Sequence, residues 1–260
     1  MAALHSLPFH TITDESGTRG AAPFMTNQGT RSLLIKRVHE EARDIRAFDV
    51  LPEGAEREHG LTFNPGQVAV LQVGEDEAAR AYFAIASAPE DDELEFLVKQ
   101  SNNPTAAALY EMPVGGRLRL VELTGRGFAL DEQKGRDLGF VAMGTGVAPL
   151  RSALRSALRR ADDFGQIVVL YGARTPEHFC YTDEVEAWKA AGVELRQVVS
   201  NPDGYEWAGS TGYVQSLLDN VLPTLSDPVA LVCGSREMIE QTRDRLHEMG
   251  FASEDILTNY

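Results

Sequence analysis

The sequence predicts two domains, an antiparallel β-barrel followed by an α/β domain with a parallel sheet. Short strand-like runs divided by turn signals such as Asn64-Pro65-Gly66 fill residues 31–123, which is typical of an antiparallel barrel or sandwich. Beyond residue 138, strand-like and helix-like segments alternate, which is typical of a parallel sheet covered on both faces. The polar run 131–137 separates these two patterns. A chain of 260 residues has room for both domains.

The domain limits follow from these patterns. We expect a disordered lead over residues 1–30, the barrel over 31–133 and the α/β domain over 134–260. Met25 is an alternative start of the chain. The strands expected in the barrel are 33–38, 45–50, 67–73, 82–86, 94–98 and 117–123. The elements expected in the second domain are strands 138–143, 166–171, 193–199 and 229–233, and helices 181–191, 213–221, 236–249 and one that begins near Pro149.

The most informative motif is a glycine turn between a strand and a helix. An apolar stretch from Leu138 leads into Gly144-Thr145-Gly146, and Val147-Ala148-Pro149 opens the helical pattern. Glycines let an anion approach the backbone, and the N–H groups and dipole of the following helix favour a phosphate there. The alternative is a structural turn without a ligand. Other ligand positions at strand ends are 172–174, Ser200 and 233–235.

Composition excludes several classes of partner and site. The net charge is −15, with no long basic run, which argues against nucleic acid and anionic membrane surfaces. Two cysteines, Cys180 and Cys233, cannot supply four thiolates to an iron–sulfur cluster, and the six histidines lack metal-ligand spacing. We therefore predict no metal site. No segment resembles a membrane span or a secretory signal, so we expect a cytoplasmic protein.

The order of several motifs resembles the ferredoxin–NADP reductase superfamily. The motifs are Pro65-Gly66-Gln67, Ile85-Ala86-Ser87-Ala88-Pro89, Gly125-Arg126-Gly127-Phe128, the Gly144–Pro149 turn, Tyr171-Gly172-Ala173-Arg174 and Cys233-Gly234-Ser235. The resemblance covers residues 31–260. Within the superfamily, the chain is similar to single-chain FAD/NAD(P)-binding oxidoreductases, including a plant fruit-protein branch.

The resemblance implies a flavin-dependent oxidoreductase. The barrel would hold FAD, with FMN left open, and the α/β domain a nicotinamide nucleotide. Hydride would pass from NAD(P)H to the flavin, and electrons would pass on to a separate acceptor. The resemblance makes Cys233 and Ser87 the predicted catalytic residues, with Cys233 beside the reacting rings. The alternative for Cys233 is a small packed hydrophobe.

The flavin strand departs from the family pattern Arg-x-Tyr-Ser. If the strand is anchored on Ile85 and Ser87, the three pattern positions fall on Ala81, Phe83 and Ala84. A shift by one residue restores Arg80 and Tyr82, but it reverses the face of every side chain unless a bulge absorbs it. We prefer the anchored register. The alternative is that the run belongs to the barrel core.

Two further segments complete the predicted flavin site. Val98-Lys99 closes a strand, and Thr105-Ala106 opens a short helix in which Asn102 replaces the family glycine and Thr105 keeps the hydroxyl. The alternative is an N-capped surface helix. Tyr260 is the last residue, and some relatives end on a Tyr that stacks on the flavin.

The nucleotide would contact Arg174, Gly234, Ser235 and Met238 as well as the glycine turn. A 2′-phosphate needs a fixed cation, and the chain has Ser200-Asn201 and Thr211-Gly212 where NADP-preferring relatives carry basic residues. NADH is therefore favoured over NADPH. The predicted cofactor-binding residues are Tyr82, Phe83, Ala84, Ile85, Ser87, Val98, Lys99, Thr105, Ala106, Gly144, Thr145, Gly146, Val147, Ala148, Pro149, Arg174, Cys233, Gly234, Ser235, Met238 and Tyr260.

Two other functions fit the same resemblance. One is a nucleotide-sensing or regulatory subunit that kept the fold and lost the flavin with the missing Arg. The other is a flavin reductase that releases flavin as a substrate.

Overall fold

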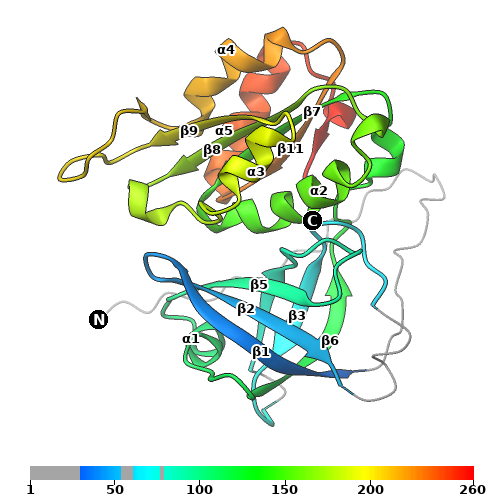
Figure 1. The fold of residues 1–260 in the computed structure, drawn as a ribbon, viewed down its shortest axis with the longest axis vertical. Coiled ribbons are helices and arrows are strands. Elements are labelled where there is room, and N and C mark those ends of the chain that lie inside the picture. The colour runs from blue at the N-terminus through cyan, green and yellow to red at the C-terminus, as the bar shows by residue number, and fades with distance from the viewer. Residues whose placement is uncertain (1–29, 54–60, 77–78) are drawn as a thin grey trace, which may run out of the picture.

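The computed structural model describes residues 30–53, 61–76 and 79–260. These residues form two six-stranded sheets, one in an N-terminal and one in a C-terminal domain (Figure 1). The predicted lead lies outside the described residues except for Thr30, and so does Met25. The predicted border at 133/134 falls in the segment that joins the last strand of the first sheet to the first strand of the second.

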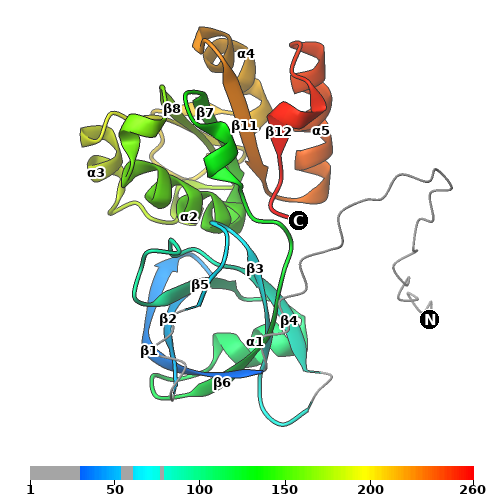
Figure 2. The ribbon, with the colours of Figure 1, turned by 90° about the vertical axis from the view of Figure 1, so that its right-hand side faces the viewer.

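The N-terminal sheet is antiparallel throughout. Its strands are β1 (Arg31–Ala42), β2 (Ile45–Pro52), β3 (Val68–Gln72), β4 (Arg80–Ala84), β5 (Leu94–Lys99) and β6 (Arg117–Thr124), in the order β4-β3-β6-β1-β2-β5. The sheet curls so far that its two edges meet, and an antiparallel bridge joins Ile85 to Phe96 (Figure 2). The predicted antiparallel domain is confirmed, although its ring closes through this bridge and not through a continuous ladder.

The interior of this ring is apolar because alternate side chains of each strand point inward. Leu33 and Ile35 of β1 and Phe48 and Val50 of β2 belong to the buried cluster. Helix α1 (Pro104–Tyr110) adds two side chains to the same cluster. The N-terminal domain therefore has a core of its own.

The C-terminal sheet is parallel, as predicted. Its strands are β7 (Asp137–Met143), β8 (Ile167–Ala173), β9 (Glu194–Val199), β10 (Ser210–Thr211), β11 (Pro228–Cys233) and β12 (Ile256–Leu257), in the order β10-β9-β8-β7-β11-β12. Helices α2 (Val147–Leu158) and α3 (Val185–Ala190) pack on one face, and α4 (Leu218–Val221) and α5 (Arg236–Glu248) on the other.

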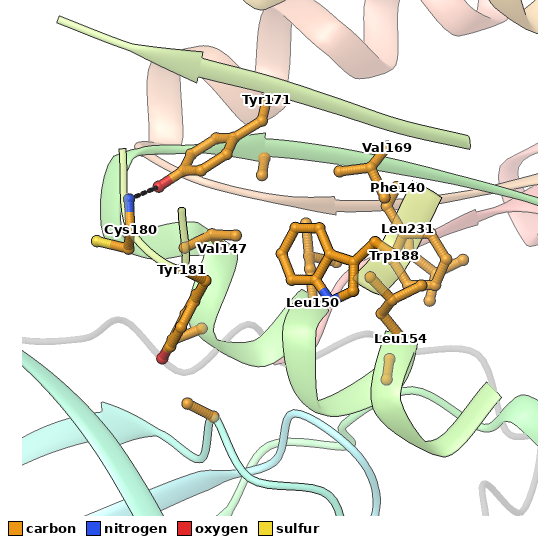
Figure 3. Packing of buried hydrophobic residues seen from close by; sticks show 14 of the residues in the cluster. Phe140, Val147, Leu150, Leu154, Val169, Tyr171, Cys180, Tyr181, Trp188 and Leu231 are labelled. Atoms are coloured by element: carbon orange, nitrogen blue, oxygen red, sulfur yellow. Dashed lines mark hydrogen bonds between the residues drawn. The ribbon is translucent and has the colours of Figure 1, made fainter. Parts of the chain in front are cut away.

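Helix α2 lies between the C-terminal sheet and the N-terminal domain (Figures 1 and 2). Its residues Leu150 and Leu154 pack with Phe140 of β7 and Trp188 of α3 (Figure 3). Ten of its twelve residues are buried, because both sides of the helix are covered. This position makes α2 the main element that joins the domains.

Two helices are shorter than predicted. The helix expected over 181–191 covers only Val185–Ala190, because Tyr181 adopts a left-handed φ of 59° that no helix accommodates. The helix expected over 213–221 begins as a 3-10 turn, Val214–Leu217, before α4. No helix within the described ranges is long and apolar enough to cross a bilayer.

Candidate functional site

A cavity of about 650 Å³ lies where the carboxyl ends of β7, β8, β9 and β11 meet the N-terminal domain. Ligands of open parallel sheets bind beyond the carboxyl ends of the strands. Residues of both domains line the cavity, with Ile45 and Lys99 from the N-terminal one. The predicted residues in its lining are Lys99, Gly144, Thr145, Gly146, Arg174, Gly234, Ser235 and Met238, together with Ser200.

Two glycines of this cavity, Gly146 and Gly234, lie in close contact with their neighbours. A β-carbon on Gly146 would lie 2.5 Å from the backbone oxygen of Cys233. A β-carbon on Gly234 would lie 2.9 Å from the sulfur of Met238. Gly144 has a left-handed φ of 55° and open space in front of it. The ends of β7 and β11 therefore approach each other closely, and the loop beside them stays accessible.

The N-termini of two helices face this region, and they are capped differently. The Ser235 hydroxyl caps α5 by accepting from the N–H of Met238 at 3.2 Å. No side chain caps α2, whose N-cap residue is Gly146. Val147, Ala148 and Pro149 are buried in its first turn behind the cavity wall. The α2 end therefore has the dipole that favours an anion, while the N–H of Val147 already donates to Gly144 and Pro149 has no N–H.

One end of the cavity is basic. Arg174 and Lys99 line it, together with His178. Burial lowers the pKa of His178, and the positive charges of Lys99 and Arg43 lower it further. His178 is thus neutral at pH 7, and its Nδ1 lies 2.7 Å from the Thr175 hydroxyl. Arg174 and Lys99, and not His178, are therefore the cations that can face a phosphate.

The lining residues that sequence reasoning missed include Tyr213, Gln215 and Gln241. The Tyr213 ring is 72% exposed and offers a flat face to a base. The Gln215 amide nitrogen donates to the Gln241 side-chain oxygen at 3.0 Å, while its own Oε1 is buried without a hydrogen-bond partner. Tyr213, an aromatic residue at the start of a predicted helix, was the signal in the sequence that could have indicated this part of the lining.

Cys233 is half-buried at the end of β11 and is not among the residues that line the cavity. Its sulfur lies 3.6 Å from Oδ1 of Asn259, to which the thiol donates. Burial raises the pKa of this thiol to about 12, and burial does the same for Cys180. Both cysteines are therefore protonated at neutral pH. The catalytic role of Cys233 stays a prediction.

The two faces of β4 carry different side chains. Its ladder with β3 is uninterrupted, so side chains alternate strictly. Ala81 is buried and Phe83 packs against the N-terminal core, whereas Arg80 is exposed and Tyr82 is 72% exposed. The outward face thus bears the Arg and Tyr of the shifted register, with Ala84 beside them. The anchored register places Phe83 in the core.

The remaining predicted flavin residues are mostly buried. Ile85, Ser87 and Val98 have almost no exposed surface. The Ser87 hydroxyl accepts a hydrogen bond from the N–H of Glu95 at 3.1 Å. The oxygen predicted to be catalytic therefore already has a partner within the N-terminal domain. Thr105 is buried in α1, and the N–H of Ala106 already donates to the Asn103 side chain at 3.0 Å. A phosphate at this helix would compete with that cap.

The C-terminal residues lie between the two domains. Asn259 is buried, and its side-chain Nδ2 donates to the backbone oxygen of Gly66 at 3.0 Å. The backbone oxygen of Asn259 accepts from the N–H of Gly127 at 3.2 Å. Tyr260 follows with 62% of its surface exposed. The chain end is therefore anchored one residue before the predicted stacking ring. Within the described ranges, no group of three or more His, Cys, Asp or Glu side chains is placed to hold a metal ion.

Comparison with known proteins identifies relatives for both domains. The family model of the oxidoreductase NAD-binding domain matches residues 140–244. Fruit protein pKIWI502 of Actinidia deliciosa is 30% identical over 80% of this chain and 74% of its own length. Ferredoxin–NADP reductase B of Sorangium cellulosum is 33% identical over 67% of this chain and 74% of its own. The birch nitrate reductase is 26% identical over 96% of this chain, but the match spans only 32% of that enzyme.

Solved structures share the two-domain fold. A ferredoxin–NADP reductase of Neisseria gonorrhoeae, with bound FAD and NADP, superposes with a TM-score of 0.74 over 88% of this chain and 96% of its own, at 21% identity. The cytochrome b5 reductase domain of Ulva prolifera nitrate reductase gives 0.76 over 91% and 100%, at 20% identity. The resemblance inferred from the motif order is confirmed: the chain belongs to the ferredoxin–NADP reductase superfamily of flavoprotein oxidoreductases.

Proposed function

We propose that this chain binds FAD and a nicotinamide nucleotide and passes electrons from NAD(P)H through the flavin to a separate acceptor. The observation that carries the proposal is the cavity between the domains, whose lining combines a glycine turn and an uncapped helix end with residues of the N-terminal domain. When bound, the two cofactors supply the hydride donor and its acceptor. The protein's part is to hold, orient and shield them.

The cavity residues fit a dinucleotide. The open loop at Gly144 and the start of α2 would hold the phosphates. Tyr213 would stack on a base, and the unpartnered Oε1 of Gln215 would accept from an amino group of that base. Each of these side chains supplies a contact that the chain itself leaves open.

The outward face of β4 fits a flavin in the shifted register. Tyr82 presents an exposed ring, and Arg80 lies two residues away on the same exposed face, where it can meet a phosphate. This assignment restores the cation that the anchored register lacks. Tyr82 and Arg80, not Phe83, would then contact the flavin.

NADH is the proposed donor. Ser200, directly after β9, lines the cavity with no basic residue next to it in the chain, and the two cations of the lining, Arg174 and Lys99, are both exposed. A 2′-phosphate gains little from exposed cations. A separate electron acceptor is supported by the cysteine content, since the two cysteines of the given sequence are too few for an iron–sulfur cluster. Location in the cytoplasm stays a prediction.

The purified chain tests the proposal. We expect it to carry FAD, to show a flavin absorbance spectrum, and to lose that absorbance when NADH is added without oxygen. A colourless chain that binds NADH but no added FAD would favour the nucleotide-sensing function. Flavin that exchanges freely during turnover would favour the flavin reductase. A chain that binds neither cofactor would contradict all three.

A further inference from the structure

Three arginines of α2 and its C-cap reach the N-terminal domain from one side of the helix. Arg151, Arg155 and Arg159 follow at four-residue spacing, which places them one above the other. Arg155 forms a two-pronged pair with Asp91 at 3.1 and 3.2 Å, and Arg159 also pairs with Asp91. Arg151 pairs with Glu95 at 3.1 Å. Asp91 and Glu95 lie in the N-terminal domain, between the predicted flavin strand and the end of β5, and Arg151 and Arg155 also share Glu184 of the C-terminal domain.

Arg151 differs from the other two because it also binds backbone. Its Nη1 donates to the oxygen of Ala86 at 3.1 Å. The next residue, Ser152, donates through its hydroxyl to the oxygen of Ser87 at 2.6 Å. Two consecutive backbone oxygens at the end of the flavin strand are therefore held by two consecutive residues of α2.

The Arg151 side chain is itself held in place from several sides. Its Nε donates to Glu184 at 2.8 Å, and its guanidinium lies 4.2 Å from the centre of the Tyr181 ring. The Tyr181 hydroxyl donates to Glu95 at 2.8 Å. Figure 3 shows Tyr181 pointing from the C-terminal domain toward the strands of the N-terminal one. Only 7% of the Arg151 side chain is exposed, so this network is shielded from water.

The same helix begins at the cavity. Its N-cap Gly146 lines the cavity, and a rise of 1.5 Å per residue puts Arg151 about 6 Å from the start of α2 at Val147. A rigid helix therefore connects the nucleotide loop to the strand end at Ala86. Displacements of about 1 Å between reacting groups can change rates about 100-fold.

We propose that Arg151 is a positioning residue that fixes the flavin strand against the nucleotide loop and so sets the separation of the two reacting rings. The proposal rests on the proposed function. It assigns Arg151 no contact with either cofactor. The planar guanidinium is needed because three different acceptors are reached at once, and the compact ammonium of a lysine cannot reach all three.

The test compares Arg151→Lys with the wild-type chain and with Arg159→Ala. Arg159→Ala is the matched control, since it removes the ion pairs with Asp91 and Glu90 on the same side of the helix without touching Ala86, Ser87 or Glu184. Flavin reduction is followed by stopped flow over a range of NADH concentrations. We expect Arg151→Lys to lower the limiting reduction rate about tenfold or more, with FAD content and the NADH dissociation constant changed less than about threefold.

A second measurement does not depend on the reaction. Hydrogen exchange of the backbone amides in residues 85–96 of the apoprotein should be faster in Arg151→Lys than in Arg159→Ala. Glu95→Gln, which keeps the shape of the site, should shift both measurements in the same direction if Arg151→Lys folds poorly. Unchanged reduction and unchanged exchange in both variants would overturn the positioning role. Failure of the wild-type chain to be reduced by NADH or NADPH would instead overturn the proposed function, and with it any part that Arg151 plays in the reaction.

Discussion

The nucleotide cavity and the flavin face are built in different ways. The cavity is enclosed by backbone: Gly146 and Gly234 let two strand ends meet, and an uncapped helix begins there. The flavin face is an exposed strand surface on which Arg80 and Tyr82 stand out, while the neighbouring helix α1 is already capped by Asn103. The difference teaches that the first site is formed before its ligand binds, whereas the second depends on side chains that the ligand itself would cover.

The largest effect is expected from Gly146→Val. The added side chain would run into the backbone of Cys233, with its first carbon 2.5 Å from the oxygen. Overpacking of this kind costs about 1–3 kcal/mol, and the displaced loop should weaken NADH binding about 100-fold. Chemical unfolding and a nucleotide titration measure the two effects.

Gly144→Ala sharpens this result, because the space beside Gly144 is open and only its left-handed φ of 55° opposes a side chain. We expect about 1–2 kcal/mol of strain and a much smaller loss of binding. Equal losses of binding in the two variants would show that close packing of the strand ends is not what forms the cavity.

The next effect separates the two registers of β4. Tyr82→Ala should weaken FAD binding about tenfold, since stacking adds about 0.5–1.5 kcal/mol beyond burial, and it should leave stability nearly unchanged. Phe83→Ala should instead cost roughly 2–4 kcal/mol of stability, because Phe83 packs against the core. Flavin titration and urea unfolding of both variants measure this. Loss of FAD binding in Phe83→Ala and loss of stability in Tyr82→Ala would instead favour the anchored register.

Much of the fold was predictable because it is encoded locally. Both sheets could be located from the turn residues and from the point at which strand-like runs give way to alternating strands and helices. The glycine turn located one wall of the cavity. The side chain of β4 that faces outward was not predictable, since Tyr82 and Phe83 are adjacent aromatics and only the folded sheet decides which one is exposed. The lining residues Gln215 and Gln241 come from different elements, so no spacing in the sequence joins them.

A smaller effect concerns Cys233. Because its thiol pKa is about 12, the native chain should be alkylated at this position far more slowly at mildly alkaline pH than the same chain in urea. Cys233→Ala should slow flavin reduction more than it weakens NADH binding. Mass spectrometry and stopped flow provide the two readouts. An unchanged reduction rate would return Cys233 to a packing role.

The smallest effect is expected at the chain end. Tyr260 is mostly exposed, so deletion of Tyr260, or Tyr260→Ala, should change stability by less than about 0.5 kcal/mol. If the ring stacks on the flavin, either change should alter the flavin spectrum and tighten nucleotide binding. A spectrum and an affinity that both stay as in the wild type would show that the last residue takes no part in the site.

The central claim is that a nucleotide in the cavity transfers hydride directly to a flavin on the N-terminal domain. The most direct measurement is anaerobic stopped-flow reduction of the FAD-loaded chain by NADH and by NADH deuterated at the transferred position of nicotinamide C4. We predict that the flavin absorbance is lost in both reactions and more slowly with the deuterated donor, because the C–H bond breaks during reduction. A flavin that binds yet keeps its absorbance with NADH and with NADPH would contradict the account.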